Sequence, residues 1–254
     1  MKTAIITGAS SGLGAEFVRQ LRSAFPEIEC IWLIARRKES LEKTAECCRG
    51  NVKVIIMPLD LTKPESLRSY ALQLESRRPD VRLLINNAGC GVLGNVGEAS
   101  TSSQTNMVDI NVRALTAITS MTLPYMQFGS HIINISSIAS FCANARMTVY
   151  SSTKAYVSSF TRGLAEELRP RGISVTAVCP GPMDTEFLPV AGITDGASHT
   201  FDVLPRCDVR KVVSGAYRAS KAGQVFYTPT AFYKFYRLAA KILPGSIVVK
   251  LAKT

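Results

Sequence analysis

A short apolar run at residues 3–7 leads into a glycine-rich turn and then into a stretch with apolar residues at helical spacing. Glycines let the backbone approach a pyrophosphate closely, and the helix N-terminus that follows offers free N–H groups and a positive dipole end. A glycine-rich turn alone is an ordinary feature, but the strand before it and the helix after it are the context that a dinucleotide-binding unit requires. We therefore expect dinucleotide contacts from Gly8, Ser10, Ser11, Gly12, Leu13 and Gly14.

Strand and helix patterns alternate along the rest of the chain, which favours an α/β fold. Apolar runs predict further strands at 30–35, 52–59, 81–85, 132–137, 173–178 and 224–228, and helices are expected at 104–126, 149–168 and 208–220. At 254 residues the chain is long enough for one large core. We expect a Rossmann-like, doubly wound parallel sheet of seven strands flanked by helices. Residues 1–229 would be the dinucleotide-binding and catalytic domain, and residues 230–254 a C-terminal extension.

Charge and cysteine content restrict the partners and the compartment. The net charge is +11, and from Arg206 onward ten Lys or Arg accompany Asp208 alone, so +9 lies in the last fifth of the chain. No base-stacking or groove-entering motif accompanies these charges, so no nucleic-acid partner is expected. Seven cysteines without a CxxC pair, and only two histidines, predict reduced thiols and no metal site. No secretory signal or membrane span is expected, and the predicted location is cytoplasmic.

The second predicted strand ends where nucleotide-binding folds select their cofactor. NAD-binding versions carry an acidic residue about twenty positions past the glycines, which binds the ribose 2′-hydroxyl. This chain has Ala35 there, followed by Arg36 and Arg37. A missing carboxylate removes the repulsion against a 2′-phosphate, and a guanidinium offers it paired donors. The pattern favours NADP(H) over NAD(H), although a solvated helix start with Lys38 and Lys43 would look similar.

Tyr150 and Lys154 form the strongest pair of candidate catalytic residues. Four residues advance a helix by about 6 Å and about one turn, so the two side chains share a face. A nearby ammonium favours the phenolate, which predicts a lowered pKa for Tyr150. Ser137, at the end of the preceding strand, could bind the same substrate oxygen. This equipment suits proton transfer to or from an alcohol or carbonyl oxygen.

Tyr217 and Lys221 repeat the same spacing. Ser137 precedes Tyr150 by thirteen residues, whereas the position thirteen residues before Tyr217 is Leu204. We therefore assign the functional role to Tyr150 and expect Tyr217 to be structural.

These motifs together resemble the classical short-chain dehydrogenase/reductase family. The family's TGxxxGxG pattern matches Thr7 to Gly14, its NNAG matches Asn86 to Gly89, and its YxxxK matches Tyr150 and Lys154. The resemblance runs from residue 3 to about 228 in order and with family spacing. It further matches Asp60, Asn111, Ser137 and the PGxxxT segment from Pro180 to Thr185.

The resemblance implies roles that the residues alone do not disclose. Tyr150 would exchange the proton, Ser137 would hold the substrate oxygen, and Lys154 would bind the nicotinamide ribose. Asn111 would position a water molecule in the proton relay. Further cofactor contacts would come from Asp60 at the adenine, from Thr185 at the carboxamide, and from Leu61, Asn87, Ala88, Gly89, Pro180 and Gly181.

We therefore expect an oxidoreductase that transfers hydride between NADP(H) and a ketone or secondary alcohol. A non-catalytic dinucleotide-binding regulator of the same fold is the alternative, but such proteins typically lose the Tyr or the Lys. The resemblance also implies a homodimer or homotetramer through helices 104–126 and 149–168, although Val157, Phe160 and Leu164 could equally pack on the sheet.

The expected substrate pocket is apolar. Residues 186–205 lack periodicity and are expected to form a mobile loop over the ligand edge. An apolar carbonyl or alcohol, such as a steroid, an acyl chain or a xenobiotic, suits the few charges among the expected lining residues Ser137, Phe141, Met147, Met183, Phe187 and Leu188.

The C-terminal extension predicts an amphipathic helix from Thr230 to a stop at Pro244, then a short apolar piece at 246–251. An apolar arc that includes three aromatic rings, those of Phe232, Phe235 and Tyr236, opposes Lys234, Arg237 and Lys241, and Lys250 and Lys253 follow. Two interpretations remain open: the helix packs on its own domain or a partner subunit, or it makes a peripheral contact with an anionic membrane.

Overall fold

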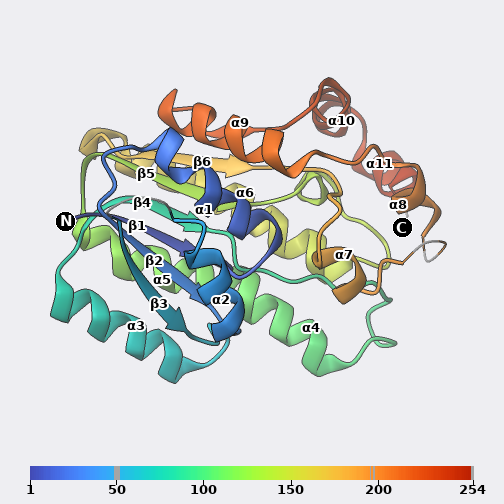
Figure 1. Cartoon of the computed structure of the whole chain (residues 1–254). Helices are drawn as coiled ribbons and strands as arrows, with labels where there is room; N and C mark the ends of the chain where they lie inside the picture. Colours follow the sequence, from blue (N-terminus) through green and yellow to red (C-terminus); the bar gives the residue numbers. More distant parts are fainter. Residues whose placement is uncertain (49–51, 195, 197, 253–254) are drawn as a thin grey trace.

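The computed structural model describes residues 1–48, 52–194, 196 and 198–252. Within these residues, seven parallel strands form one sheet, as predicted, and their order is β3-β2-β1-β4-β5-β6-β7 (Figure 1). Their bounds are β1 (Lys2–Thr7), β2 (Cys30–Ala35), β3 (Lys53–Pro58), β4 (Asp80–Asn86), β5 (Met126–Ile135), β6 (Ser174–Val178) and β7 (Phe226–Tyr227).

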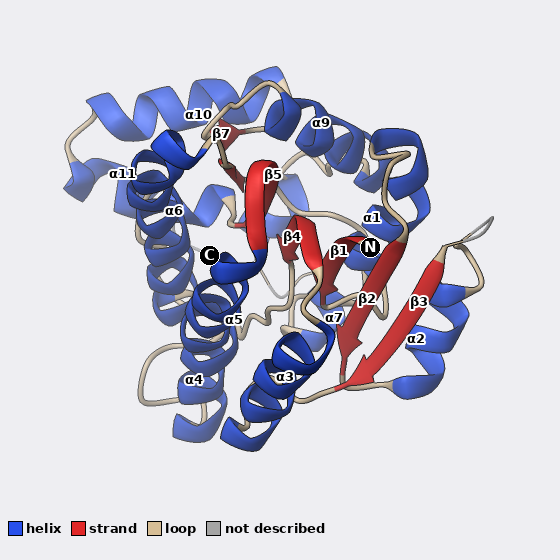
Figure 2. Ribbon diagram, turned by 90° about the vertical axis from the view of Figure 1, so that its left-hand side faces the viewer, coloured by secondary structure: helices blue, strands red, loops and turns tan. Residues whose placement is uncertain are grey.

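The inner strands are apolar because helices cover both faces of the sheet. In β2, Ile31 and Leu33 join the core on one face, while Trp32 and Ile34 join the core on the other. The first face is covered by α1 (Gly12–Ala24), α2 (Lys38–Ala45) and α9 (Val209–Lys221). The second is covered by α3 (Pro64–Arg77), α5 (Leu115–Thr122) and α6 (Thr148–Leu168), which Figure 2 shows on the opposite side of the sheet.

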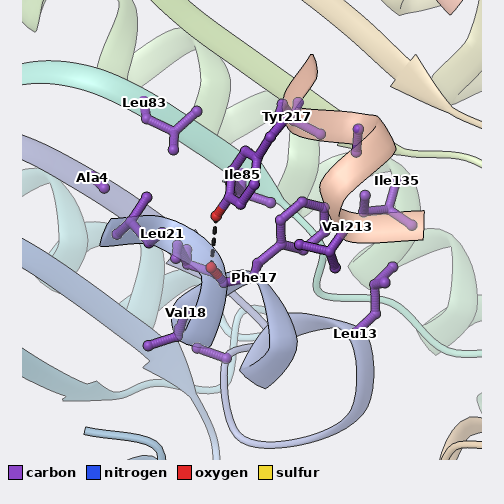
Figure 3. Close-up of a cluster of buried hydrophobic side chains, with 14 of the residues drawn as sticks. Ala4, Leu13, Phe17, Val18, Leu21, Leu83, Ile85, Ile135, Val213 and Tyr217 are labelled. Carbon is purple, nitrogen blue, oxygen red and sulfur yellow. Dashed lines mark hydrogen bonds between the residues drawn. The ribbon is translucent and has the colours of Figure 1, made fainter. Parts of the chain in front are cut away.

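Tyr217 has a structural role, as its position in the sequence predicts. Its hydroxyl donates to the Phe17 carbonyl at 2.6 Å (Figure 3), and its ring packs edge-on against Phe17 and Phe25. Lys221 donates to the Ala24 carbonyl and lies over the Phe25 ring. This second Tyr–Lys pair therefore attaches α9 to α1 in the core.

Three predicted elements differ from the structure. The strand expected at 132–137 is β5, which begins at Met126 and ends at Ile135, so Ser137 lies two residues beyond it. The single helix expected at 104–126 is instead a series of α4 (Thr101–Val108), the π-helix η1 (Asp109–Ala114), α5 and the 3₁₀ turn η2 (Leu123–Tyr125). The loop expected at 186–205 contains two short helices, α7 (Phe187–Val190) and α8 (His199–Val203). Further 3₁₀ turns are η3 (Ile138–Ser140) and η4 (Arg169–Arg171).

The C-terminal extension contains α10 (Ala231–Ile242) and α11 (Gly245–Leu251). Thr230 caps α10, because its side chain accepts a hydrogen bond from the Tyr233 N–H. The extension has five basic residues in its sequence, and one of them, Lys253, lies outside the described residues. None of the described helices combines the length and apolar character that crossing a membrane requires.

Candidate active site

The strand order reverses between β1 and β4, and ligands of open parallel sheets bind at such a switch point, beyond the carboxyl ends of the strands. A cavity of about 510 Å³ lies at this place. Its lining comes from turns that follow β1, β2, β3, β4, β5 and β6, together with α6, α7, α8 and the C-terminal extension. Segments far apart in the sequence therefore meet at one edge of the sheet, the edge towards α7 and α8 in Figure 1.

The glycine turn after β1 is fixed by the turn after β4. The Asn87 side-chain amide donates to the carbonyls of Thr7 and Gly8, both at 3.0 Å, while the Thr7 hydroxyl accepts from the N–H groups of Asn87 and Ala88. Gly8 has a φ of +64°, and a Cβ there would lie 2.7 Å from the Asn87 amide nitrogen. Both the backbone conformation and the close approach therefore require glycine at this position.

The site fits a dinucleotide. Ser11 is the N-cap residue of α1, but its side chain does not accept a hydrogen bond from the first turn of the helix. The first N–H groups of α1 therefore lack this side-chain acceptor at the edge of the cavity. A Cβ at Gly14 would collide with the Gly8 carbonyl, so only glycine permits this compact turn. All of the residues predicted to bind the cofactor line the cavity: Gly8, Ser10, Ser11, Gly12, Leu13, Gly14, Arg36, Arg37, Asp60, Leu61, Asn87, Ala88, Gly89, Tyr150, Lys154, Pro180, Gly181 and Thr185.

The two arginines after β2 have different surroundings. The Arg37 guanidinium donates to the Glu186 carboxylate at 2.6 Å and to the Ser11 hydroxyl at 3.2 Å. These contacts join the glycine turn to the segment that begins α7. Arg36 makes no ion pair with any of the described residues, although its charge helps to lower the pKa of Asp60. Partial burial acts to raise the pKa of Asp60, but the hydrogen bonds from Thr62 and the charges of Arg36 and Lys63 together lower it.

Tyr150, Ser137 and Lys154 meet at the cavity, as their spacing predicts. β5 places Ser137 just beyond its end, and α6 presents Tyr150 and Lys154 one turn apart. The Ser137 side chain lies near the Tyr150 hydroxyl and acts to lower its pKa. The Lys154 ammonium donates to the Ile135 carbonyl at 2.8 Å and lies 5.8 Å from the centre of the Tyr150 ring.

The predicted lowering of the Tyr150 pKa is wrong for this structure. Burial raises the pKa of Tyr150 to about 12, and the neighbouring Ser137 side chain opposes this only in part. Burial also lowers the pKa of Lys154 to about 8. The sequence spacing shows that the two groups are close, but it does not show that both are removed from water, which disfavours each charged form. Tyr150 is therefore a protonated phenol at neutral pH.

Asn111 is buried and does not line the cavity. Its side-chain amide donates to the Cys90 carbonyl at 2.9 Å and to the Thr153 hydroxyl at 3.0 Å, and its oxygen accepts from the Cys90 N–H. Asn111 lies in η1, where the wider π-turn interrupts the α-helix, as π-bulges often do at functional sites. A Cβ at Gly89 would lie 2.9 Å from the Asn111 oxygen and 3.5 Å from the Lys154 nitrogen. Asn111 thus lies directly behind the Lys154 side of the site.

Five of the six residues predicted for the substrate side line the cavity. Ser137, Met147, Met183, Phe187 and Leu188 line the cavity. Phe141 does not, because its ring packs against Tyr236 at 6.0 Å between centroids and against the Arg237 guanidinium at 5.9 Å. Tyr236 of α10 provides this part of the wall instead.

Sequence reasoning missed a second group of lining residues, which are Cys90, Asn144, Val190, Phe201, Leu204, Phe232, Tyr236 and Ala252. Several come from the C-terminal extension, and the Asn144 side chain donates to the Ala252 carbonyl at 2.9 Å. The amphipathic pattern of residues 231–242 signalled that this helix would contact something. It did not show that the contact would include the cavity.

Known proteins share both the sequence pattern and the fold. The model of the short chain dehydrogenase family matches residues 2–192. An uncharacterized oxidoreductase of Staphylococcus saprophyticus is 32% identical over 206 residues, which are 79% of this chain and 86% of that protein. A short-chain dehydrogenase from Sphingobium yanoikuyae, solved in complex with NADPH, is 29% identical with a TM-score of 0.80, covering 95% of this chain and 93% of that one.

A bulky-bulky ketone specific alcohol dehydrogenase from Comamonas testosteroni is also similar. It is 28% identical with a TM-score of 0.73, covering 95% of this chain and 92% of that one. The fold and the matched residues define a dinucleotide-binding oxidoreductase. The chain belongs to the short chain dehydrogenase family.

The buried Lys154 predicts a particular pH dependence of stability. Its pKa is about 8 in the folded chain against an ordinary value of 10.5, so the fold disfavours the protonated form. Below about pH 8, Lys154 is protonated in both states, and its burial lowers the free energy of unfolding by the full amount. Between about pH 8 and 10.5 the unfolded chain binds more protons than the folded chain, so the free energy of unfolding increases as pH rises. We expect Lys154→Met to raise the free energy of unfolding at pH 7 by on the order of 1–3 kcal/mol.

Urea unfolding at pH 7 and near pH 10 measures this effect. The gap between the variant and the unmodified protein should narrow at the higher pH. Lys43→Met, at an exposed position on α2, is the control and should show no such gap. An unmodified protein that is as stable as Lys154→Met at pH 7 would contradict the argument.

Proposed function

We propose that the enzyme transfers hydride between NADP(H) and an apolar ketone or secondary alcohol, with Tyr150 as the general acid/base. One observation carries this proposal. The Tyr150 and Ser137 hydroxyls both stand at the wall of the same cavity that the glycine turn lines, and Ser137 is close enough to lower the pKa of Tyr150. A carbonyl oxygen beside both hydroxyls would accept two hydrogen bonds, which stabilise the negative charge that develops on it.

The raised pKa of Tyr150 suits the reduction of a carbonyl. A phenol with a pKa of about 12 is protonated at neutral pH and can donate its proton to the oxygen as the carbon is reduced. The nicotinamide supplies the hydride, so the chain's own task is alignment and proton transfer. Lys154 places a positive charge near Tyr150, and Asn111 supports the backbone beside it at Cys90. We assign Asp60 to the adenine and Thr185 to the carboxamide.

Tyr150→Phe tests the proposal. Removing the hydroxyl removes the proton donor but keeps the ring in its contact with Phe187. We expect turnover to fall by about 100-fold or more, since general acid catalysis contributes that much. NADPH affinity should change little. The assay follows NADPH consumption with a panel of apolar ketones, and Tyr156→Phe on the same helix is the matched control, because Tyr156 bonds to Thr116 away from the cavity.

A non-catalytic regulator of the same fold is the competing proposal. It predicts that the unmodified protein binds NADPH yet consumes none with any ketone of the panel, and that Tyr150→Phe changes nothing. Ser137, Tyr150 and Lys154 are all present and lie close together, and this favours an enzyme over a regulator.

NADP(H) is the proposed cofactor because Arg36 and Arg37 both line the cavity, and because Ala35 stands where NAD-binding versions of the fold have a carboxylate. The NADPH in the similar Sphingobium yanoikuyae enzyme supports this assignment. Arg36 is exposed and is available for a 2′-phosphate, whereas Arg37 already binds the Glu186 carboxylate. A 2′-phosphate would therefore compete with Glu186 for Arg37.

Two substitutions separate these contributions to cofactor binding. Arg36→Ala should weaken NADPH binding by roughly 10- to 100-fold, the effect of losing a charge-assisted hydrogen bond, and leave NADH binding almost unchanged. Glu186→Gln should strengthen NADPH binding by about two- to fivefold, because the competing pair is exposed and therefore weak. Fluorescence titration with both cofactors measures the affinities.

The matched control for Glu186→Gln is Glu166→Gln, which also breaks an exposed Arg–Glu pair, but on α6. It should leave both affinities unchanged. Equal affinities of the unmodified protein for NADPH and NADH would refute the proposed preference.

An apolar substrate suits the wall of the cavity. Tyr150 lies within a cluster of buried apolar residues that includes Met107, Met147 and Leu188, with Phe187 and Phe201 packed against it. The similar enzyme from Comamonas testosteroni is specific for bulky-bulky ketones, and this supports a large ketone here. The ketone panel should therefore extend from small acyclic to polycyclic compounds.

We propose a homo-oligomer that uses the outer surfaces of α4, α5 and α6, which lie together in Figure 2. Val157 and Leu164 are buried within the chain, so the contact would use exposed residues such as Val108 and Tyr156. Light scattering should give at least twice the 27.5 kDa of one chain at micromolar concentration. A mass of one chain would contradict this proposal.

A further inference from the structure

The outward side of the C-terminal extension is apolar. Tyr233 is fully buried, but the predicted apolar arc of α10 is turned mostly towards solvent. The exposed apolar residues, which we call the C-terminal patch, are Phe232 (51% exposed), Phe235 (70%), Leu238 (55%), Ile242 (71%), Leu243 (43%) and Ile247 (47%). Most monomeric surfaces avoid so dense a group of large apolar side chains, and such groups mark interaction sites.

α10 is anchored to the domain through a different arc, so the patch cannot turn inward. The Tyr233 hydroxyl donates to the Pro205 carbonyl at 2.6 Å, and the Tyr236 hydroxyl lies 2.8 Å from the Cys142 sulfur. The Arg237 guanidinium stacks over the Phe226 ring at 4.4 Å. The sequence predicted that the apolar arc would oppose the basic residues. In the structure, the side of α10 that packs on the domain lies between the apolar arc and the lysines. Own-domain packing thus covers Tyr233 and Tyr236 but leaves the patch exposed.

The positive charges around the C-terminal patch indicate what kind of partner it binds. Lys234, Lys241 and Lys250 are exposed beside it, and residues 230–254 contain five basic residues and no acidic one. A second copy that used this same face would bring like charges together, which opposes a symmetric contact. An amphipathic helix with aromatic residues on one face and lysines at its border is typical of helices that lie in the interface of an anionic bilayer.

The patch is continuous with the wall of the cavity. Phe232 is half exposed and also lines the cavity, and Tyr236 lines it from the next turn of α10. On the other side, Val190 of α7 lines the cavity and is 73% exposed. An apolar path therefore connects the outer surface of α10 with the cavity.

We propose that α10 and α11 dock this protein on an anionic lipid bilayer, with the C-terminal patch in the acyl boundary and Lys234, Lys241 and Lys250 at the headgroups. The docked orientation brings the cavity next to the bilayer. This last step rests on the proposed function: an apolar ketone dissolved in the membrane would then reach Tyr150 along the path lined by Phe232.

Vesicle sedimentation of the full chain tests the docking without cofactor or substrate. We expect sedimentation with phosphatidylcholine vesicles that contain phosphatidylserine, much less with phosphatidylcholine alone, and release of the electrostatic part at roughly 1 M salt. Lys234→Gln with Lys241→Gln should weaken binding roughly 25-fold. Phe235→Ser with Ile242→Ser should weaken it by roughly tenfold or more.

Matched controls lie on distant elements. Lys43→Gln with Lys53→Gln changes two exposed lysines near the opposite edge of the sheet, and Leu72→Ser removes an exposed apolar residue from α3. Both should bind vesicles like the unmodified protein. Circular dichroism and thermal melting should show that all variants fold, since every changed side chain is exposed.

Three outcomes would overturn the proposal: no sedimentation with acidic vesicles, sedimentation that the patch variants retain, or equal losses in patch and control variants. A molecular mass that falls only in Phe235→Ser with Ile242→Ser would instead show a second copy on the patch. Because sedimentation requires no turnover, failure of the proposed activity would leave this result intact. Conversely, an active enzyme that ignores vesicles would reject the docking alone.

Discussion

The hydrogen bonds of Asn87 with Thr7 and Gly8 are the constraint on which the site depends. They join the ends of β1 and β4 at the point where the strand order reverses. Neighbouring strands to each side carry their connections away on opposite faces, and this leaves a crevice between the two turns. The side-chain amide of Asn87 donates to the Thr7 and Gly8 carbonyls in place of backbone N–H groups, which the glycine turn does not supply. The compact turn thereby keeps its shape and can present N–H groups to a ligand.

Much of this arrangement could be predicted from the sequence, because it depends on local patterns. A strand buried on both faces requires a nearly continuous apolar run, and β2 (Cys30–Ala35) has the predicted bounds. Ser137, Tyr150 and Lys154 meet because Ser137 follows the end of β5 and α6 carries the other two, and the sequence signals both elements clearly. Tyr217 could be separated from Tyr150 by its context, and the bond to Phe17 confirms a structural role.

The remainder depends on contacts between distant segments. No pattern in residues 104–126 shows a π-turn, since one extra residue per turn alters which side chain faces inward without changing composition. Phe141 and Tyr236 are both aromatic, and only their packing decides that Tyr236 forms the cavity wall. The pKa of Tyr150 was mispredicted for the same reason, because proximity to Lys154 is visible in the sequence whereas the burial of both groups is not.

The orientation of α10 shows how one glycine can determine a surface. A Cβ at Gly181 would collide with the Tyr233 ring, so the glycine after β6 creates the space that this ring fills. Tyr233 is fully buried there, and its hydroxyl is bound to the Pro205 carbonyl. Rotating α10 to bury Phe235 would expose Tyr233 and break that bond. The turn after β6, which lines the cavity, thus also holds the apolar arc of α10 towards solvent.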